Sequence, residues 1–124
     1  MLLTGCEATG DAGGTKTFSF EGVPFTVELP SEFTEETVDD ANSRGDVVAA
    51  AGLTKVDVVA VRRGADAPAG PQRHEVLGKD VTSELHAVAG FAGYVLECQY
   101  TEDRADDVRD ACATALKSVA GKRK

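Results

Sequence analysis

The chain has 124 residues, with 13 Lys and Arg against 21 Asp and Glu, and its formal net charge is −8. A chain of this length forms one domain with a core of its own, and a hydrophobic content of 42% is typical of a globular protein rather than a disordered one. The acidic balance argues against a general nucleic-acid-binding protein, because phosphate binding requires a basic surface. The sequence also lacks the stretch of roughly 18 apolar residues that a transmembrane helix needs.

The first residues resemble a lipid-attachment signal. Leu3-Thr4-Gly5-Cys6 matches the box in which a bacterial signal peptidase cuts before a Cys that carries diacylglycerol. An export signal also needs about 7–15 apolar residues upstream, and only Leu2 and Leu3 provide them here. We expect residues 1–5 to be the remnant of a lipoprotein signal and Cys6 to be lipidated. The alternative is a frayed N-terminus with a stray Cys.

The segment after Cys6 predicts a flexible tether. Residues 7–16 contain three Gly and no large apolar side chain, so nothing in them can be buried to offset the entropy of ordering. We therefore expect a lipidated tether over residues 6–15, a single domain over residues 16–120 and a basic tail over residues 121–124.

The domain begins with two stretches of alternating apolar and polar residues, 16–22 and 24–29, which predict two half-buried strands joined by a tight turn. Pro30 ends the second strand, because proline cannot donate to a strand ladder. Residues 31–44 bury little and carry five acidic residues. We expect a loop there, with at most one or two helical turns.

Two short stretches, 46–52 and 55–63, are apolar on both faces and predict central strands covered on both sides. Residues 64–71 contain two Pro and two Gly and predict a loop. Residues 73–85 are compatible with one bent strand or two short ones, and residues 86–93 form a Gly-punctuated connection.

The last part of the domain predicts a strand followed by a helix. Residues 94–101 alternate, with Cys98 on the apolar face. An apolar stripe at helical spacing, which includes Cys112, then runs from Ala105 to Val119. Thr101 is the candidate N-cap of this helix.

Cys98 and Cys112 are predicted to form a disulfide. A helix that returns over the preceding strand brings the two apolar faces together, and the bridge would close a loop of about 15 residues, which stabilises a domain by about 3 kcal/mol in the chain-entropy model. The alternative is a pair of buried free thiols. Structural disulfides belong to oxidising compartments, so the bridge agrees with an exported protein.

The acidic residues of the 31–44 segment are the candidate partner-binding surface, because acidic faces attract basic partners. They are Glu32, Glu35, Glu36, Asp39 and Asp40. A weak cation site among the last four is an alternative, and a solvated acidic face is the simplest interpretation.

No motif of the sequence forms a catalytic constellation. The two histidines, His74 and His86, lack the partner spacing of a zinc site. Cys98 could be paired with either histidine as a nucleophile, but a buried and oxidised sulfur offers no thiolate. We expect no catalytic residue, no metal and no cofactor.

The opening pattern Phe18-x-Phe20-x-Gly22-Val23-x-Phe25-x-Val27-x-Leu29-Pro30 is similar to the first hairpin of the PsbP-like superfamily. The chain as a whole resembles a small actinobacterial lipoprotein with such a domain. The resemblance implies a central antiparallel sheet between helices and a docking or accessory role, and it transfers no site residue. Phe33 stands where the superfamily usually has a Trp, and residues 31–44 have no counterpart in it.

Together these features predict an α+β domain, PsbP-like, with an antiparallel sheet and a C-terminal helix packed on it. We expect a non-catalytic lipoprotein on the outer face of the cell membrane, anchored through Cys6, that serves as an accessory or docking module for a protein partner and binds no nucleic acid. Two alternatives stay open. One is a carrier that holds a small apolar ligand between sheet and helix, and the other is a cytosolic adaptor with reduced thiols.

Overall fold

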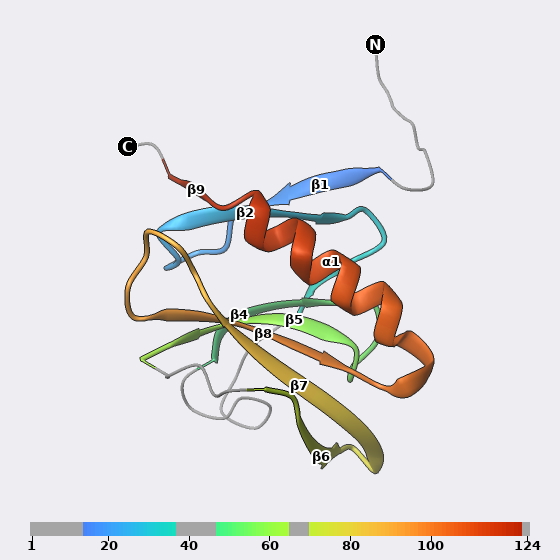
Figure 1. Cartoon of the computed structure of the whole chain (residues 1–124). Helices are drawn as coiled ribbons and strands as arrows, with labels where there is room; N and C mark the ends of the chain where they lie inside the picture. Colours follow the sequence, from blue (N-terminus) through green and yellow to red (C-terminus); the bar gives the residue numbers. More distant parts are fainter. Residues whose placement is uncertain (1–13, 37–46, 65–69, 123–124) are drawn as a thin grey trace.

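The computed structural model describes residues 14–36, 47–64 and 70–122 (Figure 1). These residues form mostly antiparallel β-structure with one α-helix near their C-terminal end, as expected for the predicted α+β class. Cys6, most of the predicted tether, Asp39 and Asp40 lie outside the described residues. In the described part, no helix is both long and apolar enough to cross a membrane.

The predicted N-terminal hairpin is present. Strands β1 (Thr15–Phe18) and β2 (Phe25–Pro30) pair antiparallel, and a short strand, β9 (Ala120–Gly121), pairs with the other edge of β2. Gly22 adopts φ +82 in the connecting turn, a conformation that L side chains rarely take. The alternate residues of β2 are fully buried, so this small three-stranded sheet has one face in the core.

A larger sheet has six strands within the described residues, in the order β3-β4-β5-β8-β7-β6, and every neighbouring pair is antiparallel. The strands are β3 (Thr34–Glu36), β4 (Val47–Gly52), β5 (Val58–Arg63), β6 (Gln72–Val76), β7 (Lys79–Ala87) and β8 (Tyr94–Tyr100). The predicted central strands are confirmed as β4 and β5. In β5, Val59 and Ala60 point to opposite faces of the sheet and both are buried.

The prediction of a loop or short helix over residues 31–44 is wrong at Thr34–Glu36, which form β3. These residues become a strand because they pair with the edge of β4, with Glu35 opposite Ala51. Three mostly exposed polar residues carry no alternation that reveals a strand, so only the distant partner defines it. Residues 37–46, the rest of this segment together with its continuation to β4, lie outside the described residues.

The stretch 73–85 forms two strands rather than one bent strand. A two-residue turn at Leu77 and Gly78 separates β6 from β7, and both residues have positive φ, 52 and 78. Two positive φ angles are the signature of the hairpin turn whose twist matches that of its strands. The turn is difficult to predict from the sequence, because a leucine rarely adopts a positive φ.

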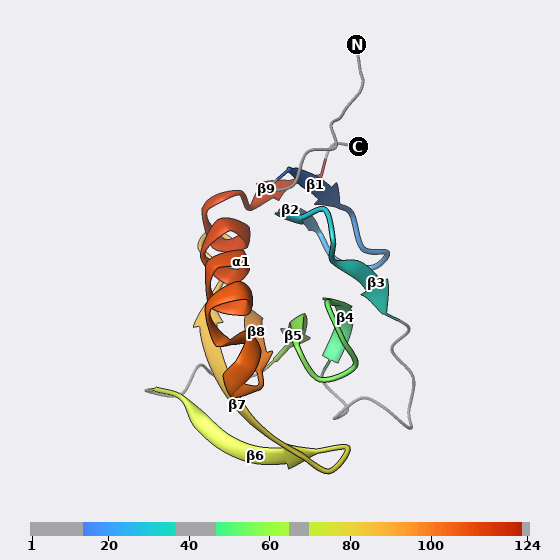
Figure 2. The same cartoon turned by 90° about the vertical axis from the view of Figure 1, so that its right-hand side faces the viewer.

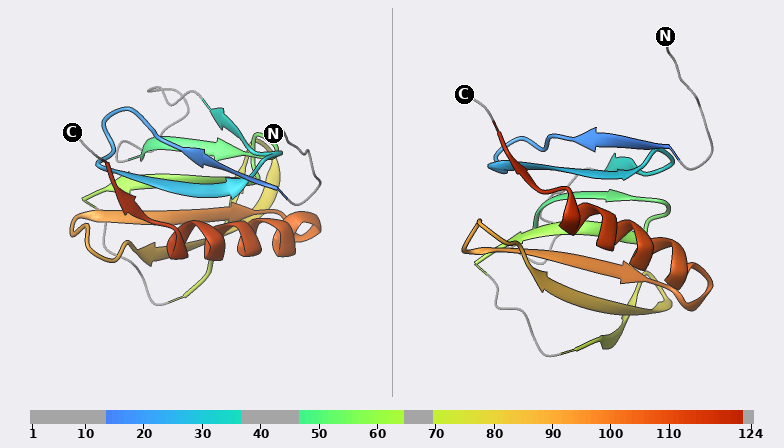
Figure 3. Two further views of the ribbon diagram at one scale, coloured as in Figure 1. Left: turned by 90° about the horizontal axis from the view of Figure 1, so that it is seen from above. Right: turned by 45° about the horizontal axis from the view of Figure 1, so that its top comes forward.

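The predicted C-terminal helix is present but starts later than expected. A 3-10 turn, η1 (Glu102–Arg104), precedes α1 (Ala105–Lys117). Thr101 stands at the N-cap of η1, but its side chain makes no capping hydrogen bond. The buried residues of α1 are Val108, Ala111, Cys112 and Ala115, and they pack against β2, β5 and β8. Figures 1 and 3 show the helix running alongside both sheets.

The core lies between the helix and the two sheets and is filled by aromatic side chains. The Phe25 ring contacts the Phe91 ring at a centroid distance of 4.8 Å and the Tyr94 ring edge-on at 5.6 Å. Phe33, between the small sheet and β3, is 1% exposed. Aromatic pairs of this kind stabilise the fold through dispersion and the burial of apolar area.

Candidate functional site

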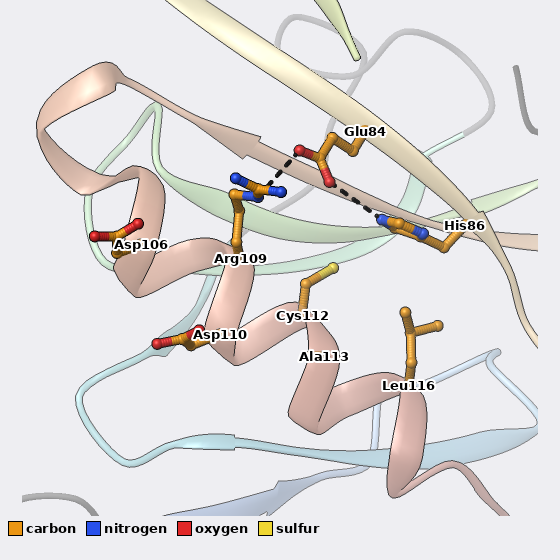
Figure 4. Close-up of a pocket in the computed structure, with 8 residues that line it drawn as sticks. All are labelled: Glu84, His86, Asp106, Arg109, Asp110, Cys112, Ala113 and Leu116. Atoms are coloured by element: carbon orange, nitrogen blue, oxygen red, sulfur yellow. Dashed lines mark ion pairs between the residues drawn. The ribbon is translucent and has the colours of Figure 1, made fainter. Parts of the chain in front are cut away.

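An open pocket of about 320 Å³ lies between the edge of α1 and strand β7 (Figure 4). Two of its lining residues, Glu84 and His86, come from β7. The other six come from α1 and are Asp106, Arg109, Asp110, Cys112, Ala113 and Leu116. The pocket therefore brings acidic and basic side chains together beside the sulfur of Cys112.

Strand register places the β7 side chains beneath the helix. Glu84 pairs with Cys98 and His86 pairs with Leu96 across the β7–β8 ladder, so all four share the face that α1 covers. Because β7 lies beyond β8, near the edge of the helix, its side chains remain partly accessible. The side chain of Glu84 is 15% exposed and that of His86 is 40% exposed.

Glu84 is the centre of a polar network in this pocket. Its Oε2 accepts the Tyr100 hydroxyl proton at 2.5 Å and lies 3.3 Å from Nε of Arg109. Its Oε1 lies 3.4 Å from Nε2 of His86. Three side chains from β8, α1 and β7 thus hold one carboxylate, and the close-up in Figure 4 shows Arg109 and His86 on its two sides.

The Tyr100 phenol responds to this environment. Burial and the hydrogen bond to Glu84 raise the pKa of Tyr100 to about 12, because both oppose a phenolate beside a carboxylate. Arg109 acts in the opposite direction but does not cancel the shift. Tyr100 is therefore a neutral hydrogen-bond donor to Glu84 throughout the ordinary pH range.

The predicted pairing of Cys98 with Cys112 agrees with the structure. The two sulfurs lie at disulfide-bonding distance, and the Cα atoms are 6.1 Å apart, within the range that a disulfide spans. Cys98 is fully buried, whereas Cys112 is 3% exposed and lines the pocket. The bridge joins α1 to the central strand β8.

His86 lies beside this cysteine pair. One ring nitrogen of His86 and the two sulfurs lie within 4.8 Å of one another. Sequence spacing did not reveal the relationship, because His86 lies 12 positions before Cys98 and the three residues come from β7, β8 and α1. The available signal was the alternation of β7, which puts Glu84 and His86 on one face.

The predicted partner-binding residues are only partly described. Glu32 and Glu35 are exposed, and Glu36 is half-buried with an oxygen 3.6 Å from Nζ of Lys55. Asp39 and Asp40 lie outside the described residues, so their part in a partner surface or in a weak cation site stays a prediction.

A second acidic surface lies on the solvent side of the C-terminal helical segment. We call it the acidic helix face, and its exposed members are Glu102, Asp103, Asp106, Asp107 and Asp110. Arg104 and Arg109 are interleaved with them, and Arg104 lies 3.4 Å from Asp107. Figure 2 shows α1 and β3 on opposite sides of the molecule, so this face is separate from Glu35.

Comparisons with protein-family models, curated proteins and solved structures found no match for this chain. The features of the described residues that bear on function are the Cys98–Cys112 pair, the polar network around Glu84 and the acidic helix face.

Proposed function

We propose that this chain is a non-catalytic docking module that works on the outer face of a cell membrane, held there by a lipid on Cys6. The observation that supports export is the Cys98–Cys112 pair at disulfide distance. Structural disulfides persist in oxidising compartments and are rare where thiols are kept reduced. The lipid-attachment box at residues 3–6 and the Gly-rich segment after it supply the anchor.

The packing of the described core favours docking over a carrier function. A carrier for an apolar ligand needs an enclosed apolar cavity of several hundred Å³. Here the fully buried Phe25 ring packs against the partly buried rings of Phe91 and Tyr94 at the edge of the core. The pocket beside α1 is open and lined largely by charged side chains, a composition that suits polar contacts at a surface.

The acidic helix face favours a positively charged protein as the partner. Five carboxylates on η1 and α1 are exposed to solvent, and the net charge of the whole chain is −8. Such a surface steers a positively charged partner toward it, and the effect weakens as salt screens it. Glu32 and Glu35, on the other side of the molecule, form a second contact region in this proposal.

We also propose that the domain is PsbP-like. The aromatic hairpin, the antiparallel sheet and the Cys-bearing strand followed by a helix support this assignment. The resemblance also implies a sheet between helices, whereas the described residues contain one α-helix and a second, smaller sheet. That resemblance favours an accessory role and adds no site residue.

Export and anchoring are tested with the chain behind a complete lipoprotein signal in a bacterial host. The parent protein should fractionate with membranes, and Cys6→Ser should move it to the medium or the soluble extracytoplasmic fraction. Cys112→Ser is the control, because it leaves the lipid-attachment site intact. Membrane fractionation that Cys6→Ser leaves unchanged contradicts the anchor.

Docking is tested separately by photo-crosslinking in the same cells. A photoreactive residue at position 107, on the acidic helix face, should form a protein adduct that weakens at high salt and in the triple variant Asp103→Asn, Asp106→Asn, Asp110→Asn. A photoreactive residue at position 79, exposed at the start of β7, is the matched control. Equal adducts at both positions, or adducts that the triple variant leaves unchanged, contradict docking through this face without bearing on export.

A further inference from the structure

We propose that the reduced form of the Cys98–Cys112 pair, together with His86, binds one thiophilic d10 metal ion, Zn²⁺ or Cu⁺. The three residues then alternate between two states, a disulfide with a free imidazole and a metal held by two thiolates and that imidazole. The proposal rests only on described residues and requires neither the anchor on Cys6 nor a docking partner.

The geometry fits a metal without rearrangement of the fold. The two sulfurs and a His86 ring nitrogen lie within 4.8 Å of one another. Around Zn²⁺, with bonds of about 2.3 Å to sulfur and 2.0 Å to nitrogen, tetrahedral donors lie roughly 3.5–3.8 Å apart. Opening the S–S bond and moving the donors by roughly 1 Å satisfies these distances, which rotation about the side-chain torsions of three residues can supply.

A carboxylate that could orient the imidazole lies beside it. Oε1 of Glu84 lies 3.4 Å from Nε2 of His86, while Tyr100 and Arg109 hold the other carboxylate oxygen. Histidines that bind metals almost always direct their second ring nitrogen to a carboxylate, carbonyl or water, which fixes the ring and raises its basicity. In this proposal Nδ1 of His86 binds the metal, so that Nε2 stays beside Glu84. A disulfide that serves only to stabilise the fold needs no histidine with a neighbouring carboxylate beside it.

The pocket gives both the metal and a reductant access to the sulfur. Cys112 forms part of the pocket wall, beside His86 and Arg109 (Figure 4). On Zn²⁺ a fourth position would be left for water or an external donor, whereas Cu⁺ is satisfied by the two thiolates and the imidazole. Soft thiolate donors favour these ions over Mg²⁺ and Ca²⁺.

A dithiol can supply the two electrons and two protons that convert the disulfide into the two thiols. A thiolate of the dithiol attacks one sulfur of the pair through the pocket and forms a mixed disulfide. Its second thiol then resolves that bond, so the reductant becomes a disulfide and Cys98 and Cys112 become thiols, with two electrons and two protons transferred. Metal binding replaces the two thiol protons, which are released to solvent.

The test uses the whole chain with Cys6→Ser, which removes the third thiol. After reduction with a phosphine and removal of the reductant under argon, the protein is titrated with Zn²⁺ in competition with a chromogenic chelator, and with Co²⁺ as a spectroscopic probe. We expect one metal per chain, thiolate-to-cobalt charge-transfer absorption, and release of up to about two protons per Zn²⁺, depending on pH. The oxidised chain should bind neither ion.

The two histidines provide a matched pair of variants. His86→Gln should weaken Zn²⁺ binding by at least about tenfold, and Glu84→Gln should weaken it by about 10–100-fold as the loss of an orienting partner. His74→Gln should bind the metal as the parent does. His74 is hydrogen-bonded to Ser83, and the Ser83 side chain lies on the opposite face of the sheet from His86. A parallel titration with Cu⁺ identifies which of the two ions binds more tightly.

The proposal fails if the reduced chain binds neither Zn²⁺ nor Cu⁺, or if His86→Gln binds as tightly as His74→Gln. Circular dichroism of each reduced sample accompanies the titrations. Binding that is the same for all histidine variants and for a chain unfolded in urea would show two cysteines acting as an unstructured chelator, which also overturns the proposal.

Discussion

Asp57 Oδ1 accepts the backbone N–H of Thr101 at 2.7 Å and the Thr101 hydroxyl proton at 3.0 Å. Its other oxygen accepts the Thr54 hydroxyl proton at 2.7 Å. Asp57 is 3% exposed, so these bonds compensate for the removal of its charge from water. One buried carboxylate therefore ties the β4–β5 loop to the start of the helical segment. The Thr101 hydroxyl donates to this carboxylate and makes no capping hydrogen bond to the helical segment.

Substitution of Asp57 should destabilise the domain more than its loop position suggests. Asp57→Ala leaves the Thr101 N–H without its acceptor, at a cost of about 2–3 kcal/mol in the free energy of unfolding, and Asp57→Asn should cost less because its amide oxygen still accepts one bond. Urea denaturation measures both. Asp103→Asn, an exposed acid on η1, is the control and should stay within about 0.5 kcal/mol of the parent. An Asp57→Ala variant as stable as that control would show that the carboxylate is dispensable.

The Cys98–Cys112 bridge should be present in protein prepared without reductant. The intact mass should be lower than that of the reduced form by two hydrogens, and digestion should yield a peptide that joins β8 to α1. Replacement of both residues by Ala should lower the free energy of unfolding by about 2–5 kcal/mol, the usual loss for a disulfide in a small domain. Two alkylatable thiols in the native, non-reduced chain would rule out the bridge and favour the cytosolic adaptor.

Tyr100 should give the unfolding free energy a dependence on alkaline pH. Its pKa is raised from 10.0 to about 12 in the folded chain, so the folded state holds this proton more tightly than the unfolded state does. The resulting stabilisation is fully present below pH 10 and is lost as the pH rises toward 12, with an upper limit of about 3 kcal/mol.

The measurement is the difference in unfolding free energy between the parent and Tyr100→Phe across that pH range. The difference should shrink with rising pH, because only the parent carries the titrating phenol in the core. Titration of phenolate absorbance in the two proteins assigns the high-pKa step. A parent and variant that lose stability in parallel would show that Tyr100 ionises alike in both states.

The sequence predicted best where side-chain periodicity and burial coincide. The alternation of β8 and the helical stripe of α1 put Cys98 and Cys112 on facing apolar surfaces, and those surfaces do meet. It predicted least where a long-range pairing decides the structure. Strand β3 exists because Glu35 lies opposite Ala51, and nothing within Thr34–Glu36 itself requires a strand.

The pocket could not be predicted from the sequence, because it also depends on a long-range strand pairing. Its network needs the register of β7 against β8, which sets Glu84 opposite Cys98 and brings His86 to the cysteine pair. Local alternation shows that Glu84 and His86 share a face, but it does not show which residues of another strand they meet. A shift of one residue would turn both side chains away from α1.

Gly52 provides a packing test of the β4–β5 hairpin. A Cβ at Gly52 would lie 2.6 Å from Cγ1 of Val58 and 2.7 Å from the Thr54 carbonyl oxygen, and both distances are shorter than real Cβ contacts. Gly52→Ala should therefore force the turn that holds Asp57 to shift and should cost about 1–3 kcal/mol in the free energy of unfolding. Gly121→Ala is the matched control, because a Cβ there would meet Phe91 at an ordinary 3.6 Å. Equal urea midpoints for the two variants would mean that the hairpin absorbs the extra methyl group without strain, and a loss confined to Gly52→Ala would locate the close packing in this turn.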